Sequence, residues 1–182
     1  MAYSDRKALR QAAAKALKGH TDAEDRVYPS RVTTVLGRGD RHLPMLLVYT
    51  QDESAAEWNA APRMYRRDLQ LVVEVLEEAD SGVDDQLDDI AAQVERAIEM
   101  DDTLGGLADH TLLQSSTQGL DDSTHRTLGV HRMIYEVSYI QHALSEEDLY
   151  SAGNAVDEWE RSTEIDAGGH QALSEHNYED EQ

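Results

Sequence analysis

The stretch RMYRRDLQLVVEVLEE, residues 63–78, decides how the chain is interpreted. Within it Leu69, Leu71, Val73 and Val75 occur at every second position, with mostly polar neighbours between them. A period of two is typical of a β-strand that buries one face in a core. The sequence therefore predicts a strand over residues 63–78, and the other elements are best understood in relation to it.

Composition limits the classes of protein to which the chain can belong. Of its 182 residues 40% are apolar, and it contains neither phenylalanine nor cysteine. We therefore predict one domain with a modest aliphatic core, and disulfides, thiol nucleophiles and cysteine-ligated metals are excluded. The sequence has no apolar run of about 18 residues and no apolar segment of a secretory signal at its start. We expect a protein made in the cytoplasm that works in solution or within an assembly, without a membrane.

The charge is strongly negative and unevenly distributed. The chain has 37 acidic and 16 basic residues, a net charge of −21. Residues 145–182 hold twelve acids and one base, whereas residues 26–41 hold four arginines and one acid. Negative surface opposes broad binding of nucleic acids or anionic membranes. The acidity fits solubility, a salt-adapted host or a role in partner recognition.

Before residue 63 the sequence predicts one helix and up to two strands. Residues 5–18 carry an alanine-rich apolar stripe and end at Gly19, as expected for an amphipathic helix. Residues 31–36 could form a short strand before a turn at GRGD, and MLLVYT at residues 45–50 predicts a buried strand. We interpret residues 51–62 as a connector with at most one helical turn.

After the strand at residues 63–78 the sequence predicts the clearest helix. Its apolar residues follow the i, i+3, i+4, i+7 pattern without a gap, at Val83, Leu87, Ile90, Ala91, Val94, Ala97 and Ile98. Ser81 and Asp84 resemble a capping box, and further acids fill the first turn. We therefore expect a helix with one buried face and one anionic, solvated face.

Two more strands and a polar extension complete the pattern. Residues 110–120 and 126–142 are separated by a short polar turn, which predicts an antiparallel hairpin. We therefore expect an α+β domain over residues 1–143, with a mostly antiparallel (mixed) sheet and helices packed on one face. Apolar residues become rare after residue 143, so we expect residues 144–182 to form a flexible acidic C-terminal extension that is disordered or ordered by a partner.

No catalytic, cofactor-binding or metal-ligating pattern is present in the sequence. The eight histidines are scattered, without HExxH spacing. Paired acids could ligate a hard cation, but Asp84–Asp85 and Asp88–Asp89 lie on the polar face of a helix, and no calcium-loop pattern occurs. Nothing combines a nucleophile, a base and an oxyanion hole. We therefore expect a protein that is not an enzyme and needs no cofactor.

The basic residues indicate a contact surface. Arginines outnumber lysines by thirteen to three, and the planar guanidinium grips carboxylates at two points. A coding bias would give the same skew. The candidates for a subunit or tube interface are Arg26, Tyr28, Arg31, Arg38, Arg41, Arg63, Arg66 and Arg67. The candidates for an acidic partner face in a head-to-tail contact are Asp84, Asp85, Asp88, Asp89 and Glu95.

The order of several segments resembles a known family. RVYPSRV, LPMLLVYT, RRDLQLVVEVLEE, DDQLDDIAAQVERAIEMD and HRMIYEVSYI follow one another as in the tail terminator proteins of long-tailed bacteriophages, the lambda-type minor tail proteins. The resemblance covers about residues 5–143, and the acidic extension departs from a minimal subunit of this kind.

The resemblance implies a structural virion protein at the head-proximal end of the tail, assembled in the host cytoplasm. Such a subunit forms a hexameric ring that caps the tail tube, ends its polymerisation and meets head-completion or connector proteins. DNA passes through the lumen without specific binding, which suits an anionic wall. The alternatives are a head–tail completion or adaptor protein of similar build, or a small acidic protein-binding module.

Overall fold

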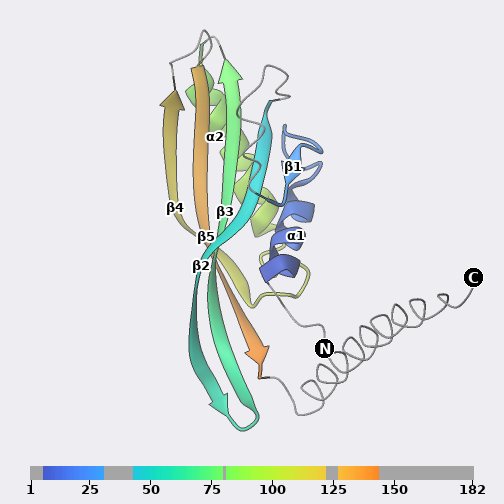
Figure 1. The fold of residues 1–182 in the computed structure, drawn as a ribbon. Helices are drawn as coiled ribbons and strands as arrows, with labels where there is room; N and C mark the ends of the chain where they lie inside the picture. The colour runs from blue at the N-terminus through green and yellow to red at the C-terminus, as the bar shows by residue number, and fades with distance from the viewer. Residues whose placement is uncertain (1–5, 31–42, 80, 122–126, 144–182) are drawn as a thin grey trace, which may run out of the picture. The chain divides into compact units, whose positions relative to one another are not determined.

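The computed structural model describes residues 6–30, 43–79, 81–121 and 127–143. In this part of the chain five strands form one sheet in the order β1-β2-β3-β5-β4, accompanied by two helices (Figure 1). β1 pairs in parallel with β2, and the other neighbours are antiparallel. The fold is therefore α+β with a mixed sheet, as predicted. The predicted strand at residues 31–36 and the extension at residues 144–182 lie outside the described residues.

The two segments with the strongest alternation lie side by side at the centre of the sheet. β3 (Arg63–Ala79) pairs antiparallel with β5 (Thr127–His142) along its whole length. Leu71 lies opposite Tyr135, and Val73 lies opposite Met133. All four side chains are buried in the main core, which confirms the predicted buried face of β3.

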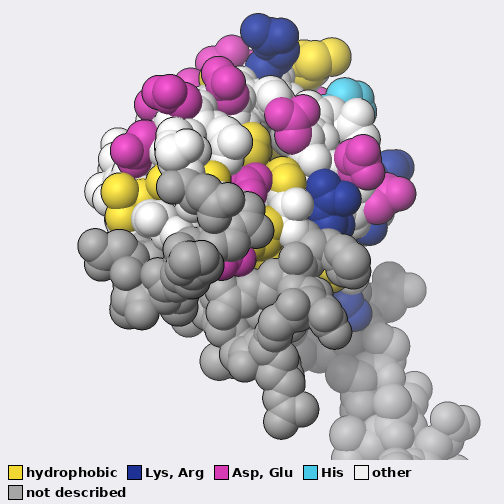
Figure 2. All heavy atoms as spheres, turned by 90° about the horizontal axis from the view of Figure 1, so that it is seen from above, with side chains coloured by type: hydrophobic (Ala, Val, Ile, Leu, Met, Phe, Trp, Pro, Cys, Tyr) yellow, Lys and Arg dark blue, Asp and Glu magenta, His cyan; other side chains and the backbone are white. Residues whose placement is uncertain are grey.

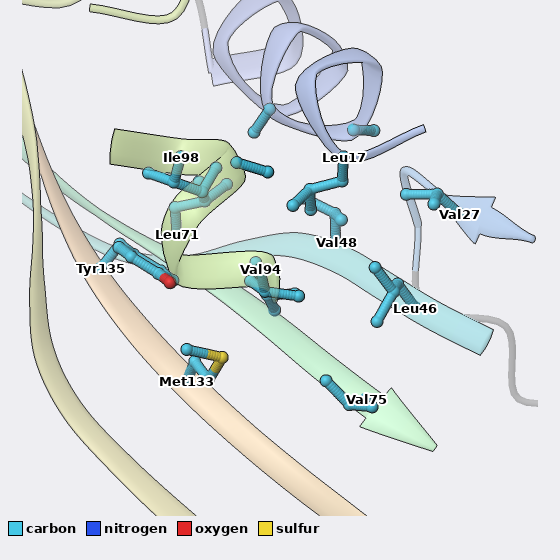
Figure 3. Packing of buried hydrophobic residues seen from close by; sticks show 14 of the residues in the cluster. Leu17, Val27, Leu46, Val48, Leu71, Val75, Val94, Ile98, Met133 and Tyr135 are labelled. Carbon is cyan, nitrogen blue, oxygen red and sulfur yellow. The ribbon is translucent and has the colours of Figure 1, made fainter. Parts of the chain in front are cut away.

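Both helices cover the same face of the sheet. α1 (Arg6–Leu17) and α2 (Val83–Glu99) bury their apolar stripes against it. Figure 3 shows buried side chains from both helices and from the strands packed together. The labelled core residues are Leu17, Val27, Leu46, Val48, Leu71, Val75, Val94, Ile98, Met133 and Tyr135. A smaller buried cluster lies on the opposite face, made of Met45, Leu47, Tyr49, Val72 and Leu76. None of the described helices is long and apolar enough to cross a membrane.

A glycine lets α2 approach the centre of the sheet closely. A Cβ atom at Gly129 of β5 would lie 2.5 Å from Leu87 Cδ1 and 2.9 Å from Val83 Cγ2. Real Cβ atoms do not approach other carbons so closely, because interiors are packed at crystal-like density. Gly129 therefore fixes the distance between the first two turns of α2 and β5.

The second half of β2 corrects the prediction of a connector. β2 (Met45–Ala60) runs through residues 51–60 as a strand and pairs with β3 from Met45↔Leu76 to Ala60↔Arg63. Most of residues 51–60 are exposed. The segment buries no apolar side chain, so it has no apolar alternation to reveal it, and the ladder with β3 holds it extended.

The structure can also be compared with the sequence predictions at the start of α2, at β1 and at β4. The predicted capping box is wrong, because the N-cap is Gly82, with φ 70° and no side-chain hydrogen bond, so Ser81 lies one residue before the cap. The sequence did not predict β1 (Val27–Tyr28). The predicted hairpin of residues 110–120 and 126–142 is confirmed, as β4 (His110–Asp121) pairs antiparallel with β5.

Candidate functional site

The far part of the β2–β3 hairpin extends beyond both helices (Figure 1). We call residues 57–66 the hairpin end. Trp58 is 57% exposed there, the Arg66 guanidinium carbon lies 5.9 Å from the centroid of its ring, and Arg63 is exposed. An arginine beside an exposed tryptophan is typical of the centre of a protein interface, because both give large contact energies when buried by a partner.

Arg66 is only loosely held by its own chain. Its Nε lies 3.4 Å from Asp68 Oδ1, and its Nη2 lies 3.5 Å from Ser138 Oγ. The Ser138 hydroxyl itself donates to Asp68, so that carboxylate already has a partner. With its side chain 40% exposed, Arg66 keeps donors for an acceptor outside the chain.

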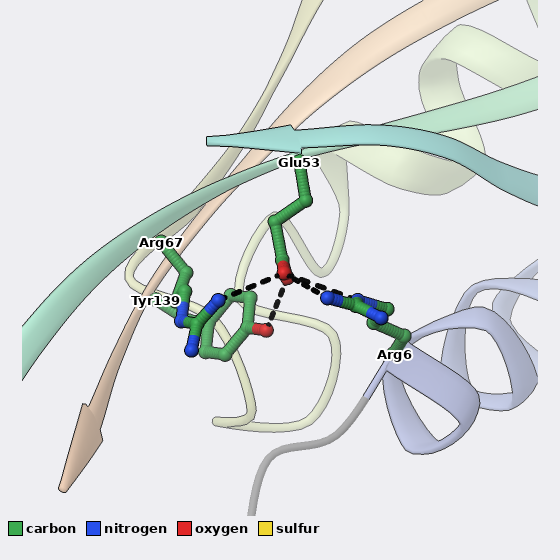
Figure 4. Close-up of polar contacts among 4 residues, drawn as sticks. All are labelled: Arg6, Glu53, Arg67 and Tyr139. Carbon is green, nitrogen blue, oxygen red and sulfur yellow. Dashed lines mark hydrogen bonds and ion pairs between the residues drawn. The ribbon is translucent and has the colours of Figure 1, made fainter. Parts of the chain in front are cut away.

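Arg67 points to the other face of the hairpin and joins a polar cluster within the chain (Figure 4). Its Nη1 donates to Glu53 Oε2 at 3.1 Å. Arg6, from the first turn of α1, donates to the same oxygen from Nε and Nη2, and the Tyr139 hydroxyl donates to Oε1 at 2.6 Å. We call Arg6, Glu53, Arg67 and Tyr139 the Glu53 cluster. It ties α1, β2, β3 and β5 together where the hairpin leaves the helices.

The electrostatics of the Glu53 cluster favour a charged glutamate. The Glu53 side chain is 6% exposed, and burial alone would raise its pKa, but the hydrogen bonds from Arg6 and Tyr139 and the charges of Arg6 and Arg67 outweigh burial and lower it. The same contact raises the pKa of Arg6. Burial, then the hydrogen bond to Glu53, raises the pKa of Tyr139.

The structure separates the predicted interface residues into two groups. Arg63 and Arg66 are available at the hairpin end, and Tyr28 is exposed on β1. Arg26 donates to the carbonyl oxygens of Pro44 and Asp22, so it braces its own chain, as Arg67 does. The remaining candidates, Arg31, Arg38 and Arg41, lie outside the described residues.

The predicted acidic residues of α2 form an exposed face. Asp84, Asp85, Asp88 and Asp89 are exposed and Glu95 is half-buried. Gln118 of β4 donates to Asp84 Oδ1 at 3.1 Å, so this side of α2 adjoins β4. Figure 2 looks onto the end of the sheet where β3 ends and α2 begins, and shows more acidic than basic side chains.

A serine, a histidine and an aspartate also meet between β4, β5 and α2. The Ser116 hydroxyl and His131 Nε2 are hydrogen-bonded, and His131 Nδ1 lies 3.8 Å from Asp88 Oδ1. In a catalytic triad the carboxylate accepts a hydrogen bond from Nδ1, and 3.8 Å is beyond that reach. We therefore interpret this group as a structural contact. Among the described residues no three His, Asp or Glu side chains converge on a possible metal site.

β4 adds apolar surface that the sequence did not single out. It is paired with β5, and Leu112, Leu113 and Leu120 are exposed along it. Leu113 and Leu120 pair with Tyr135 and Gly129, which belong to the face covered by the helices. Leu113 and Leu120 therefore continue the surface of α2, whereas Leu112, which pairs with Glu136, lies on the other face.

Comparison with known proteins adds no relative. No protein-family model matches the chain, and no curated protein is significantly similar to it.

Proposed function

We propose that this chain is a structural subunit of a bacteriophage tail, which assembles as a ring on the last ring of the tail tube and ends tube polymerisation. The ring would join the tail to head-completion proteins at the head-proximal end of the tail. The order of the quoted segments supports this proposal, and the α+β fold with helices on one face is the build expected for such a subunit.

The observation that carries the proposal is a pair of different exposed surfaces near opposite edges of the sheet. Trp58 lies on β2, near one edge, and the exposed leucines lie on β4, at the other edge. Two unlike surfaces on one subunit favour head-to-tail contacts, and such contacts close into rings when the rotation between neighbours closes. Outer strands also offer unpaired backbone groups for further contacts.

The net charge of −21 fits passage of DNA through the ring. Phosphates are held mainly by lysine and arginine contacts, which release counterions. An acidic lumen lacks this attraction, so DNA would slide through it without adhering. Arg63 and Arg66 at the start of β3 then serve contacts between proteins, whereas Arg67 braces its own chain through Glu53.

The test is the mass of the purified chain in solution, measured by mass photometry with and without the tail tube protein. We expect a closed oligomer of six copies, six times the 20.4 kDa of one chain, alone or on the end of assembled tubes. In assembly reactions, adding the chain should stop tube growth at a fixed ratio of chain to tube ends.

Two outcomes would contradict the proposal. A ring that binds head-completion proteins but leaves tube growth unchanged would favour the adaptor interpretation. A chain that remains monomeric, with tube protein present, would favour a small acidic protein-binding module.

A further inference from the structure

Basic and acidic surfaces lie at opposite ends of the same strand. Arg63 begins β3, and Ala79, where β3 ends, lines one pocket with Asp89 and Gln86 of α2. At about 3.3 Å per residue, the 17 residues of β3 span roughly 55 Å. The hairpin end therefore cannot reach the first turns of α2 within one chain, but it can reach them in another copy.

The hairpin end has unused binding capacity. Arg63 makes no ion pair with any described residue, Arg66 is loosely held, and Trp58 exposes more than half of its surface. Burying the exposed part of this tryptophan against a partner would be favourable. These three side chains together suit an acceptor with carboxylates beside an apolar patch.

The surface shared by α2 and β4 has these properties. Asp84 and Asp88 lie on the side of α2 that faces β4, as their contacts with Gln118 and His131 show. Leu120, two residues beyond Gln118 on the same face of β4, is 53% exposed. Asp84 and Asp88 are also four residues apart, and like charges at this spacing destabilise a helix. Cations from a partner would relieve this repulsion.

We propose that the hairpin end of one copy docks on the α2–β4 surface of the next copy. Arg63 and Arg66 pair with Asp84 and Asp88, and Trp58 packs against Leu120. Charge complementarity selects a second copy as the occupant, because each chain carries both halves of the contact at positions that cannot meet within it. This contact rests on the proposed function only in that copies meet head to tail. It is the contact that would join neighbouring subunits of the proposed ring.

The test uses two variants with reversed charges. Arg63→Glu with Arg66→Glu places acids opposite Asp84 and Asp88, and Asp84→Lys with Asp88→Lys places bases opposite the arginines. Each variant alone should associate about 30-fold more weakly or worse, because two charge pairs are lost and replaced by repulsion. Mixed in equal amounts, the two variants should assemble again as alternating copies, since every contact in the mixture is complementary.

Two controls separate this contact from general effects. Asp85→Lys with Asp89→Lys changes the net charge equally on the same helix but on exposed positions away from Gln118 and His131, and should assemble as the unmodified chain does. Trp58→Ser keeps all charges and should still weaken association, because the apolar part of the contact is lost. Urea unfolding of each variant checks that the fold is retained.

The outcomes distinguish the contact from the function. Variants that assemble normally, or a mixture that fails to recover, would overturn the contact even if rings form and cap tubes. Recovery in the mixture by a chain that does not cap tubes would support the contact and contradict the tail function. An unmodified chain that stays monomeric would overturn the contact, and binding of the hairpin end to the tube protein would then identify that protein as its occupant.

Discussion

Replacing Glu53 with alanine is expected to lower the free energy of unfolding by about 3 kcal/mol, because the partners left behind are partly buried and charged. Arg67 is 26% exposed at its side chain and would lose its carboxylate, and the Tyr139 hydroxyl would lose its acceptor. Arg6 is 61% exposed and contributes little, since water replaces the lost pair. Urea unfolding followed by circular dichroism measures the change.

Glu57→Ala is the matched control for this variant. Glu57 lies on the same strand, is exposed and makes no ion pair with a described residue, so its removal should change stability by less than about 0.5 kcal/mol. Equal effects of the two substitutions would show that the Glu53 cluster does not stabilise the fold.

The Glu53 cluster also predicts how stability depends on pH. The pKa of Glu53 is lowered in the folded chain, so its contribution is complete above the ordinary glutamate pKa and is lost as the pH falls through the lower folded value. The pKa of Tyr139 is raised, so its contribution is complete below the ordinary tyrosine pKa and is lost as the pH rises towards the folded value. Glu53→Gln should therefore flatten the acid side of the stability profile. An unchanged acid side would contradict this assignment.

Replacing Gly129 with valine is expected to lower the free energy of unfolding by about 2–3 kcal/mol through overpacking. The new Cβ would collide with Leu87 and Val83, and Leu87 is fully buried, so it cannot swing into solvent. The strand preference of valine offsets at most about 1 kcal/mol of this loss. The free energy of unfolding in urea measures the effect.

Gly119→Val on the neighbouring strand is the matched control, because a Cβ atom there meets nothing within 4 Å. Its effect should be within about 1 kcal/mol. In a double-mutant cycle, Gly129→Val should cost less when Leu87 is already alanine, since the truncated side chain leaves room. Strictly additive effects would show that Leu87 is not what opposes the new side chain.

The sequence predicts the elements whose side chains are sorted by burial. The apolar residues of β3, β5 and α2 that face the main core recur with periods of two and 3.6, which are visible in the letters, although β3 also buries Val72 and Leu76 on its other face. Residues 51–60 of β2 are held by backbone pairing with β3 and bury no apolar side chain, so their strand conformation leaves no apolar pattern. β1 is two residues long, too short for any period.

The candidate site is only partly visible in the sequence for a similar reason. An arginine looks the same whether its partner lies in its own chain or in another, so Arg63 and Arg66 could not be separated from Arg67 and Arg26. Glu53 gave no signal, because its partners come from α1, β3 and β5 and meet only in the fold. Trp58 could have been noticed as a large apolar residue among polar neighbours.

The strand order has a consequence for synthesis. β5 is the last of the described strands along the chain but lies between β3 and β4, so the ribosome makes one of the two central strands after the other four described strands. Until residues 127–142 emerge, β3 lacks β5 as its neighbour, and β4 has no partner among the described strands. Pairings between strands this far apart in sequence form slowly, and strands with unpaired edges are prone to aggregate before they pair. A chain truncated before Thr127 should therefore fail to fold, whereas chains that extend past His142 complete the sheet in one step.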